Sequence, residues 1–132
     1  MNKIRNWLYI GDYNDALDYH GLTRHKVGAV LQLAGPVNHP GIVSKYIWVQ
    51  DAMPLPEHQL RRGLQFILEN KDKVVFVGCA AGVSRSATFC IAALKEVEGL
   101  SLKSAYDEVK NARQIINPHF TLWTSLRKYY GE

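Results

Sequence analysis

The sequence predicts an α/β domain in which a central, mostly parallel sheet of about four or five strands is flanked by helices. Short apolar runs alternate along the chain with segments whose apolar residues recur every three or four positions. The runs are rich in β-branched and aromatic residues, which is typical of strands. Because strand-like and helical segments alternate, a parallel sheet covered by helices accounts for the pattern.

The N-terminal half contains most of the predicted strands. Strand-like runs occupy residues 7–10, 27–33, 45–50 and 74–77, and helical patterns occupy residues 14–22 and 57–70. The first five residues, Met1 to Arg5, are mostly charged and polar and lead directly into the first run. They therefore do not resemble the apolar part of a signal peptide.

Three helices are expected after the last strand, because apolar residues recur at helical spacing over residues 87–97, 102–113 and 120–130. Gly99 suits the end of the first helix, and Ser101 suits the N-cap of the second. Asn117-Pro118 separates the second helix from the third. Aromatic residues of the third helix are expected to pack against the core or other helices rather than to stack on nucleic-acid bases.

Composition points to one domain over residues 1–132, since 47% of its residues are hydrophobic and can form a core. A formal charge of +4 weakly favours an anionic substrate, and a monomer is expected. No apolar run reaches the roughly 20 residues that span a bilayer, so no membrane partner is expected. Two cysteines do not form a disulfide framework, which favours free thiols in the cytoplasm.

A cysteine and an arginine enclose the turn between the strand at 74–77 and the following helix. The turn reads Cys79-Ala80-Ala81-Gly82-Val83-Ser84-Arg85-Ser86. Its small side chains leave successive N–H groups free to point at one anion, and the helix dipole adds to their effect. This potential favours the Cys79 thiolate, and Arg85 can hold two phosphoryl oxygens at once. The turn therefore indicates phosphate chemistry with a thiol nucleophile.

Residues 79–88 resemble the phosphate loop of cysteine-dependent protein phosphatases, specifically the dual-specificity branch of the protein tyrosine phosphatase superfamily. Residues 8–11, 30–34 and 105–120 are also similar to this family, so the resemblance covers nearly the whole chain. It implies a single dual-specificity phosphatase catalytic domain with a protein tyrosine phosphatase-like fold. It also implies a phosphorylated protein as substrate, a phosphate or sulfate anion in the loop, and no metal or other cofactor.

The resemblance further implies a mechanism with two displacements. Cys79 attacks the phosphoryl group to form a cysteinyl-phosphate, while Asp51 protonates the leaving oxygen and later acts as base on water. Asp51 precedes a proline-containing loop similar to the family's general-acid loop. Ser86 matches the hydroxyl residue that hydrogen-bonds the sulfur when it leaves.

The remaining roles concern anion binding and support of the loop. Arg85 and the backbone N–H groups hold the phosphoryl oxygens, and the predicted substrate-binding residues are Ala80, Ala81, Gly82, Val83, Ser84 and Arg85. Asn117 lies in the stretch that resembles the family's support beneath the loop.

Some residues have a second interpretation. Glu57 follows the acid loop closely enough to be a rival acid, and Ser86 also suits an early helix position. Asn117 is equally suited to a capping turn. Cys90 is expected to be a packing residue, with a regulatory disulfide to Cys79 as the alternative.

One position departs from the family. The residue before the catalytic cysteine is usually histidine, which orients the loop and favours the thiolate, and here it is Gly78. We therefore expect activity with an optimum shifted toward higher pH, and a rate that Gly78→His would raise.

Three functions are consistent with these residues. The first is hydrolysis of phosphotyrosine, with phosphoserine and phosphothreonine, in proteins. The second is the same chemistry on a phosphoinositide, an RNA 5′ end or a small phosphate ester, although such enzymes often carry basic residues inside the loop and this one has none. The third is a phospho-residue binding module with little turnover, which Gly78 alone favours. The histidines are dispersed, so no metal site is predicted.

Overall fold

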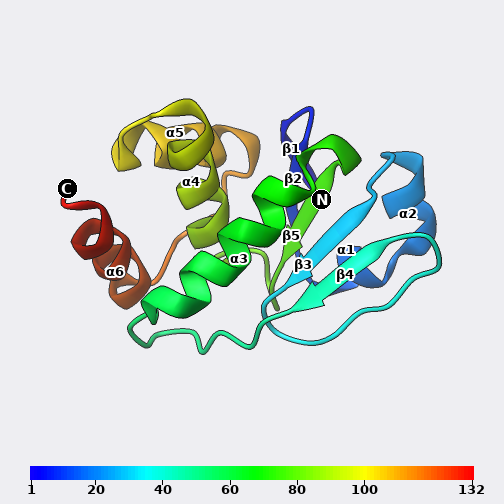
Figure 1. Cartoon of the computed structure of the whole chain (residues 1–132), viewed down its shortest axis with the longest axis horizontal. Coiled ribbons are helices and arrows are strands. Elements are labelled where there is room, and N and C mark those ends of the chain that lie inside the picture. Colours follow the sequence, from blue (N-terminus) through cyan, green and yellow to red (C-terminus); the bar gives the residue numbers. More distant parts are fainter.

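A five-stranded sheet forms the centre of the chain, and the computed structural model describes all of residues 1–132 (Figure 1). The strands are β1 (Asn2–Arg5), β2 (Leu8–Gly11), β3 (Ala29–Gln32), β4 (Val43–Tyr46) and β5 (Val75–Gly78). They lie in the order β1-β2-β5-β3-β4, with β1 antiparallel to β2 and every other pair parallel. The predicted α/β fold with a mostly parallel sheet is confirmed.

Helices cover both faces of this sheet. They are α1 (Tyr13–Leu17), α2 (Tyr19–Arg24), α3 (Glu57–Glu69), the short 3-10 helix η1 (Lys71–Lys73), α4 (Arg85–Glu98), α5 (Leu102–Ala112) and α6 (Phe120–Tyr130). The buried residues of α3 to α6 form one core with one face of the sheet, and those of α1 and α2 form a second, smaller core with the opposite face. None of the helices is both long and apolar enough to cross a bilayer.

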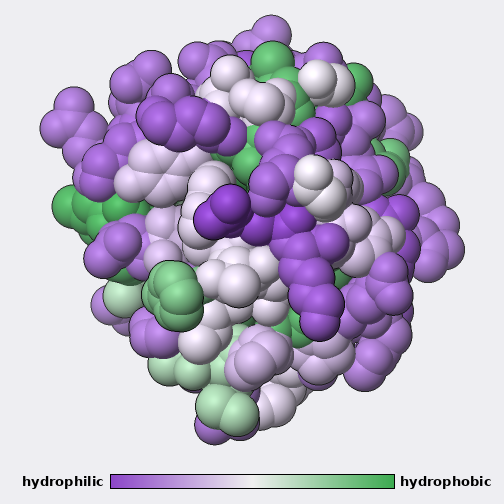
Figure 2. All heavy atoms as spheres, turned by 90° about the vertical axis from the view of Figure 1, so that its left-hand side faces the viewer, coloured by the Kyte–Doolittle hydropathy of each residue, from purple (hydrophilic) through white to green (hydrophobic).

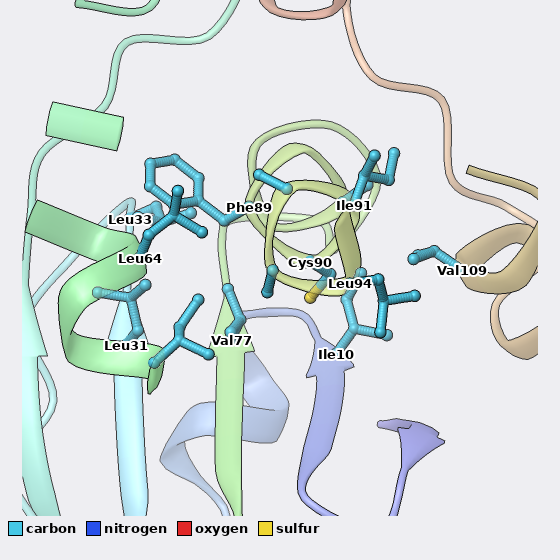
Figure 3. Close-up of a cluster of buried hydrophobic side chains, with 14 of the residues drawn as sticks. Ile10, Leu31, Leu33, Leu64, Val77, Phe89, Cys90, Ile91, Leu94 and Val109 are labelled. Carbon is cyan, nitrogen blue, oxygen red and sulfur yellow. The ribbon is translucent and has the colours of Figure 1, made fainter. Parts of the chain in front are cut away.

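Successive strand residues supply these two cores in alternation, as expected for side chains that point to opposite faces. Val75 and Val77 of β5 face the larger core, whereas Phe76 faces the smaller one. Figure 3 shows Val77 of β5 and Leu31 of β3 on the face of the sheet that α3 and α4 cover. Because both faces are covered, the strands at the centre of the sheet are buried throughout, and Gln32 at the end of β3 is the exception to their otherwise mostly apolar sequences.

Two elements near the N-terminus differ from the sequence prediction. No strand was predicted at β1, since its residues are mostly polar and only partly buried, as suits an edge strand. The helix predicted at 14–22 is divided at Asp18. The Asp18 carboxylate accepts a hydrogen bond from the Gly21 N–H at 3.0 Å, so it caps a new helix where the first one ends.

The strand predicted at 45–50 lies earlier in the chain, at 43–46. Ile47 and Val49 are nevertheless buried, and their N–H groups bond to the carbonyl oxygens of Gln32 and Leu33 at 2.9 and 3.2 Å. Buried and exposed residues therefore continue to alternate after β4 has ended. This segment leads the chain from β4 to the carboxyl edge of the sheet.

β5 is the middle strand of the five, so the segment after it emerges at the centre of that edge. Ligands of open parallel sheets bind outside the carboxyl ends of their strands. The loop between β5 and α4 therefore lies where the ligands of such sheets bind.

Candidate active site

Cys79 follows the last residue of β5, and its side chain is only 2% exposed. Its Sγ lies 3.2 Å from the Oγ of Ser86, which is buried in the first turn of α4. The predicted nucleophile and its predicted hydroxyl partner are therefore in contact. Because the bond joins residues seven positions apart, the intervening chain must form a closed turn.

The carbonyl groups of residues 80–84 in this turn all accept hydrogen bonds from residues outside the turn. The donors are Tyr13 N–H to Ala80 (3.2 Å), Arg113 Nη2 to Ala81 (3.2 Å), Arg113 Nε to Gly82 (2.8 Å), Asn117 N–H to Val83 (2.8 Å) and Thr88 N–H to Ser84 (3.0 Å). In a trans peptide the N–H points away from the neighbouring C=O. Outward carbonyls thus turn the amides inward, and no N–H of residues 80–85 donates to another protein group. These amides form a nest suited to one anion.

Gly82 makes the tight turn possible. Its φ is +68°, in the left-handed region that glycine adopts without strain. A Cβ at this position would lie 2.7 Å from the carbonyl carbon and oxygen of Gly11 at the end of β2. Both the conformation and the close backbone approach therefore require glycine.

Arg85 is the first residue of α4, and its guanidinium is held at the edge of the turn. Its Nη1 donates to the carbonyl oxygen of Val49 at 2.9 Å, and its Cζ lies 5.7 Å from the centre of the Trp48 ring. These contacts restrain a long side chain beside Cys79 and leave other guanidinium N–H groups available to an anion.

Asp51 lines the same cavity as Cys79 and Arg85, and the volume of this cavity is about 350 Å³. The Asp51 carboxylate accepts a hydrogen bond from Ser84 Oγ at 2.8 Å, and this hydroxyl accepts one from the His119 N–H at 2.9 Å. Glu57, the rival acid, lines a separate cavity with Leu60 and Tyr129. The geometry therefore favours Asp51.

Residues 8–132 match the family described as dual specificity phosphatase, catalytic domain. The chain belongs to this family. It is 31% identical to mouse dual specificity protein phosphatase 2, in an alignment covering 94% of this chain and 41% of that protein. It is also 31% identical to human dual specificity protein phosphatase 22, covering 98% of this chain and 73% of that protein. The crystal structure of human DUSP28 superposes with a TM-score of 0.93 at 25% identity, covering 99% of this chain and 96% of that one.

The chain spans less than half the length of mouse dual specificity protein phosphatase 2. What this dual-specificity phosphatase domain shares with that protein is therefore the catalytic domain. The predicted family and fold are confirmed by these matches.

Support of the loop after β5 in this member of the family comes from Arg113, a residue that the sequence analysis did not name. Besides its two bonds to the loop, the Arg113 guanidinium donates from Nη1 to Asn2 Oδ1 at 2.7 Å. Asn117 contributes through its backbone N–H, while its exposed side chain lines the cavity wall. The resemblance had indicated that the stretch containing Arg113 supports the loop, but it named Asn117 rather than Arg113 as the supporting residue.

Gly78, where the family usually has histidine, is closely surrounded. A Cβ there would lie 2.6 Å from Phe76 Cε1 and 2.9 Å from Gln32 Oε1. Gln32 is itself buried, and neither polar atom of its amide has a hydrogen-bond partner. The space beside Gly78 is thus already filled. This argues against the higher rate that the sequence analysis expects for Gly78→His.

Cys90 lies in the core on α4, and both cysteines of this dual-specificity phosphatase are free thiols (Figure 3). Burial raises the pKa of the Cys90 thiol, and the neighbouring Cys79 raises it further. A buried, neutral thiol among apolar side chains agrees with the predicted packing role.

Proposed function

We propose that this domain is a metal-independent phosphoprotein phosphatase that hydrolyses phosphotyrosine, and also phosphoserine and phosphothreonine, through a cysteinyl-phosphate intermediate. The observation that supports the proposal is that the N–H groups of residues 80–85 donate to no other protein group, beside a cavity that Cys79, Arg85 and Asp51 all line. Such preorganised donors stabilise charge on the transferring group.

In the first step, the loop amides and Arg85 hold three phosphoryl oxygens while the Cys79 thiolate approaches the phosphorus in line with the leaving oxygen. The S–P bond forms as the P–O bond to the substrate breaks. Asp51, in its protonated form, gives its proton to the leaving oxygen, so the product departs as a neutral hydroxyl.

In the second step, water attacks the phosphorus of the cysteinyl-phosphate. The Asp51 carboxylate takes a proton from this water as the P–O bond forms and the S–P bond breaks. The Ser86 hydroxyl, 3.2 Å from Sγ, donates a hydrogen bond to the departing thiolate. Inorganic phosphate leaves and Cys79 returns to its starting state.

Features of the cavity favour this function over the alternatives. The interior residues Ala80, Ala81 and Val83 that line it are small and uncharged, so no added cation selects an inositol phosphate or an RNA end. Cys79 and Asp51 are both in place, which a pure binding module does not need. Free cysteines also suit the reducing cytoplasm, where we propose that the domain acts.

Turnover of p-nitrophenyl phosphate and of a phosphotyrosine peptide, in EDTA and with reductant, tests the proposal. Cys79→Ser should abolish both activities. Asp51→Asn should lower kcat/KM for the peptide by about 10²-fold, and for p-nitrophenyl phosphate by less because its leaving group needs less protonation. Glu57→Gln is the matched carboxylate control and should retain activity.

Two results would replace this function with another. If the reduced wild-type protein bound the phosphotyrosine peptide without hydrolysing either substrate, the domain would be a binding module. If Glu57→Gln, rather than Asp51→Asn, lost peptide turnover, the assignment of the acid would be wrong.

A further inference from the structure

A second cavity adjoins the candidate active site. Its volume is about 540 Å³, and its lining residues are Lys103, Tyr106, Asn117, Pro118, His119, Phe120 and Trp123. Asn117 and His119 also line the cavity that contains Cys79. The two cavities therefore share the segment between α5 and α6 as a common wall.

Aromatic side chains dominate this second cavity. Tyr106 and Trp123 pack edge to face with their ring centres 5.7 Å apart. Phe120, in the first turn of α6, is 76% exposed, which is the highest value among the exposed large hydrophobic residues of the chain. Trp123, Tyr129 and Tyr130 pack against the core as expected, with Leu122 and Leu126 as the buried residues of this helix, whereas Phe120 is left outside.

The charge at this cavity is already neutralised. The only cationic lining residue besides the histidine is Lys103, whose Nζ is 2.6 Å from Asp107 Oδ1 and lies over the Tyr106 ring. A second phosphate would find no free cation cluster here. The lining instead favours an apolar or aromatic side chain, which buries its surface against the rings.

Figure 2 faces the α6 end of the molecule, where hydrophobic atoms (green) lie in small separate groups among hydrophilic ones. A continuous apolar face, as between stable subunits, is not present in this view. Partly or fully exposed aromatic residues around one cavity are better suited to bind a single side chain than to bind the surface of another folded protein.

We propose that this cavity, defined by Tyr106, Phe120 and Trp123, is a specificity pocket for an apolar side chain of the polypeptide substrate, close in sequence to the phosphorylated residue. The proposal rests on the proposed function. A chain that places its phosphoryl group above Cys79 runs past the common wall at Asn117 and His119, and its neighbouring residue then enters the pocket. Polypeptide substrates are thereby favoured over phosphate esters that have nothing to place there.

Two phosphotyrosine peptides test the pocket, one with leucine and one with serine at each of the three positions on both sides of the phosphotyrosine. Wild-type kcat/KM should favour the leucine peptide by about tenfold, as expected for an apolar side chain entering an apolar pocket. Phe120→Ala should remove most of that preference, with a smaller effect on p-nitrophenyl phosphate. The control is Leu68→Ala, an exposed leucine at the far end of α3, which should keep the preference.

Binding measured with Cys79→Ser separates this proposal from the proposed function, because it needs no turnover. Tighter binding of the leucine peptide, reduced by Phe120→Ala in the Cys79→Ser background, would support the pocket even if the wild-type protein were inactive. Equal binding of the two peptides would overturn the pocket and leave the phosphatase assignment intact. Faster turnover of phosphatidylinositol phosphate vesicles than of either peptide would also overturn it, in favour of a lipid substrate.

Discussion

Gly78→Ala is predicted to destabilise the protein, even though alanine is normally the better residue in a strand. The added methyl would lie 2.6 Å from Phe76 Cε1, where ordinary contacts are 3.4–4 Å, so the ring must move by about 1 Å. The ring has no free space, because it is fully buried and its Cε2 is 2.8 Å from the place of a Cβ on Gly11.

The size of the effect follows from two opposing contributions. Overpacking of a core costs about 1–3 kcal/mol, and replacing a strand glycine by alanine returns about 0.5–1 kcal/mol of backbone entropy. The free energy of unfolding should therefore fall by about 1–2 kcal/mol. Gly78→His carries a larger side chain into the same space, so it should unfold more easily still and hydrolyse p-nitrophenyl phosphate no faster than the wild type.

Urea unfolding of the wild type, Gly78→Ala, Phe76→Leu and the double variant measures this directly. Leucine leaves room for the methyl, so the double variant should be more stable than the sum of the single effects by about 0.5 kcal/mol or more. A Gly78→Ala protein as stable as the wild type, or a faster and equally stable Gly78→His, would refute the packing argument.

Other predictions concern the supports and buried groups around the site. Arg113→Met should lower kcat/KM for p-nitrophenyl phosphate about tenfold or more, with a smaller change in urea stability, because two loop carbonyls lose their donor. Iodoacetamide on the native protein should modify Cys79 and spare Cys90, as mass spectrometry would show, since burial raises the pKa of the Cys90 thiol. The Arg5 guanidinium lowers the pKa of Glu98, so their bond stabilises the fold above about pH 5 and is lost as the pH falls through the folded-state pKa. Arg5→Met should therefore cost about 1 kcal/mol at pH 7 and much less near pH 3 in urea unfolding.

A specific result would contradict each of these three predictions. An Arg113→Met enzyme with unchanged kinetics would show that the remaining donors suffice for the loop. Alkylation of Cys90 at the rate of Cys79 would mean that the core opens readily. A stability difference for Arg5→Met that stays constant from pH 7 to pH 3 would exclude an ionic contribution from Glu98.

Local patterns predicted the strand, turn and helix around Cys79 because the chemistry there is contiguous in the chain. Residues 79–86 carry the thiol, the amides and the guanidinium in one contiguous stretch, and β5 and α4 follow from apolar periodicity. Asp51 could be proposed only from the resemblance to the family. Its approach to Ser84 depends on how the loop after β4 crosses the edge of the sheet.

The parts that were not predicted depend on tertiary contacts. β1 has little apolar character, and it pairs because β2 presents an open edge. Phe120 fits the helical pattern yet lies outside, since Leu122 and Leu126 determine which side of α6 is buried. The fit of Phe76 under Gly78 likewise has no signal in a single sequence.

The hydrogen bonds to the loop carbonyls connect the middle of the chain to both of its ends. Tyr13 comes from the first helix, whereas Arg113 and Asn117 come from the segment between the last two. A peptide of residues 75–90 would contain the thiol, the amides and the guanidinium but none of these three anchors. If the domain acts as we propose, it should bind phosphate only after these distant segments have docked, and its activity should then report the completion of folding.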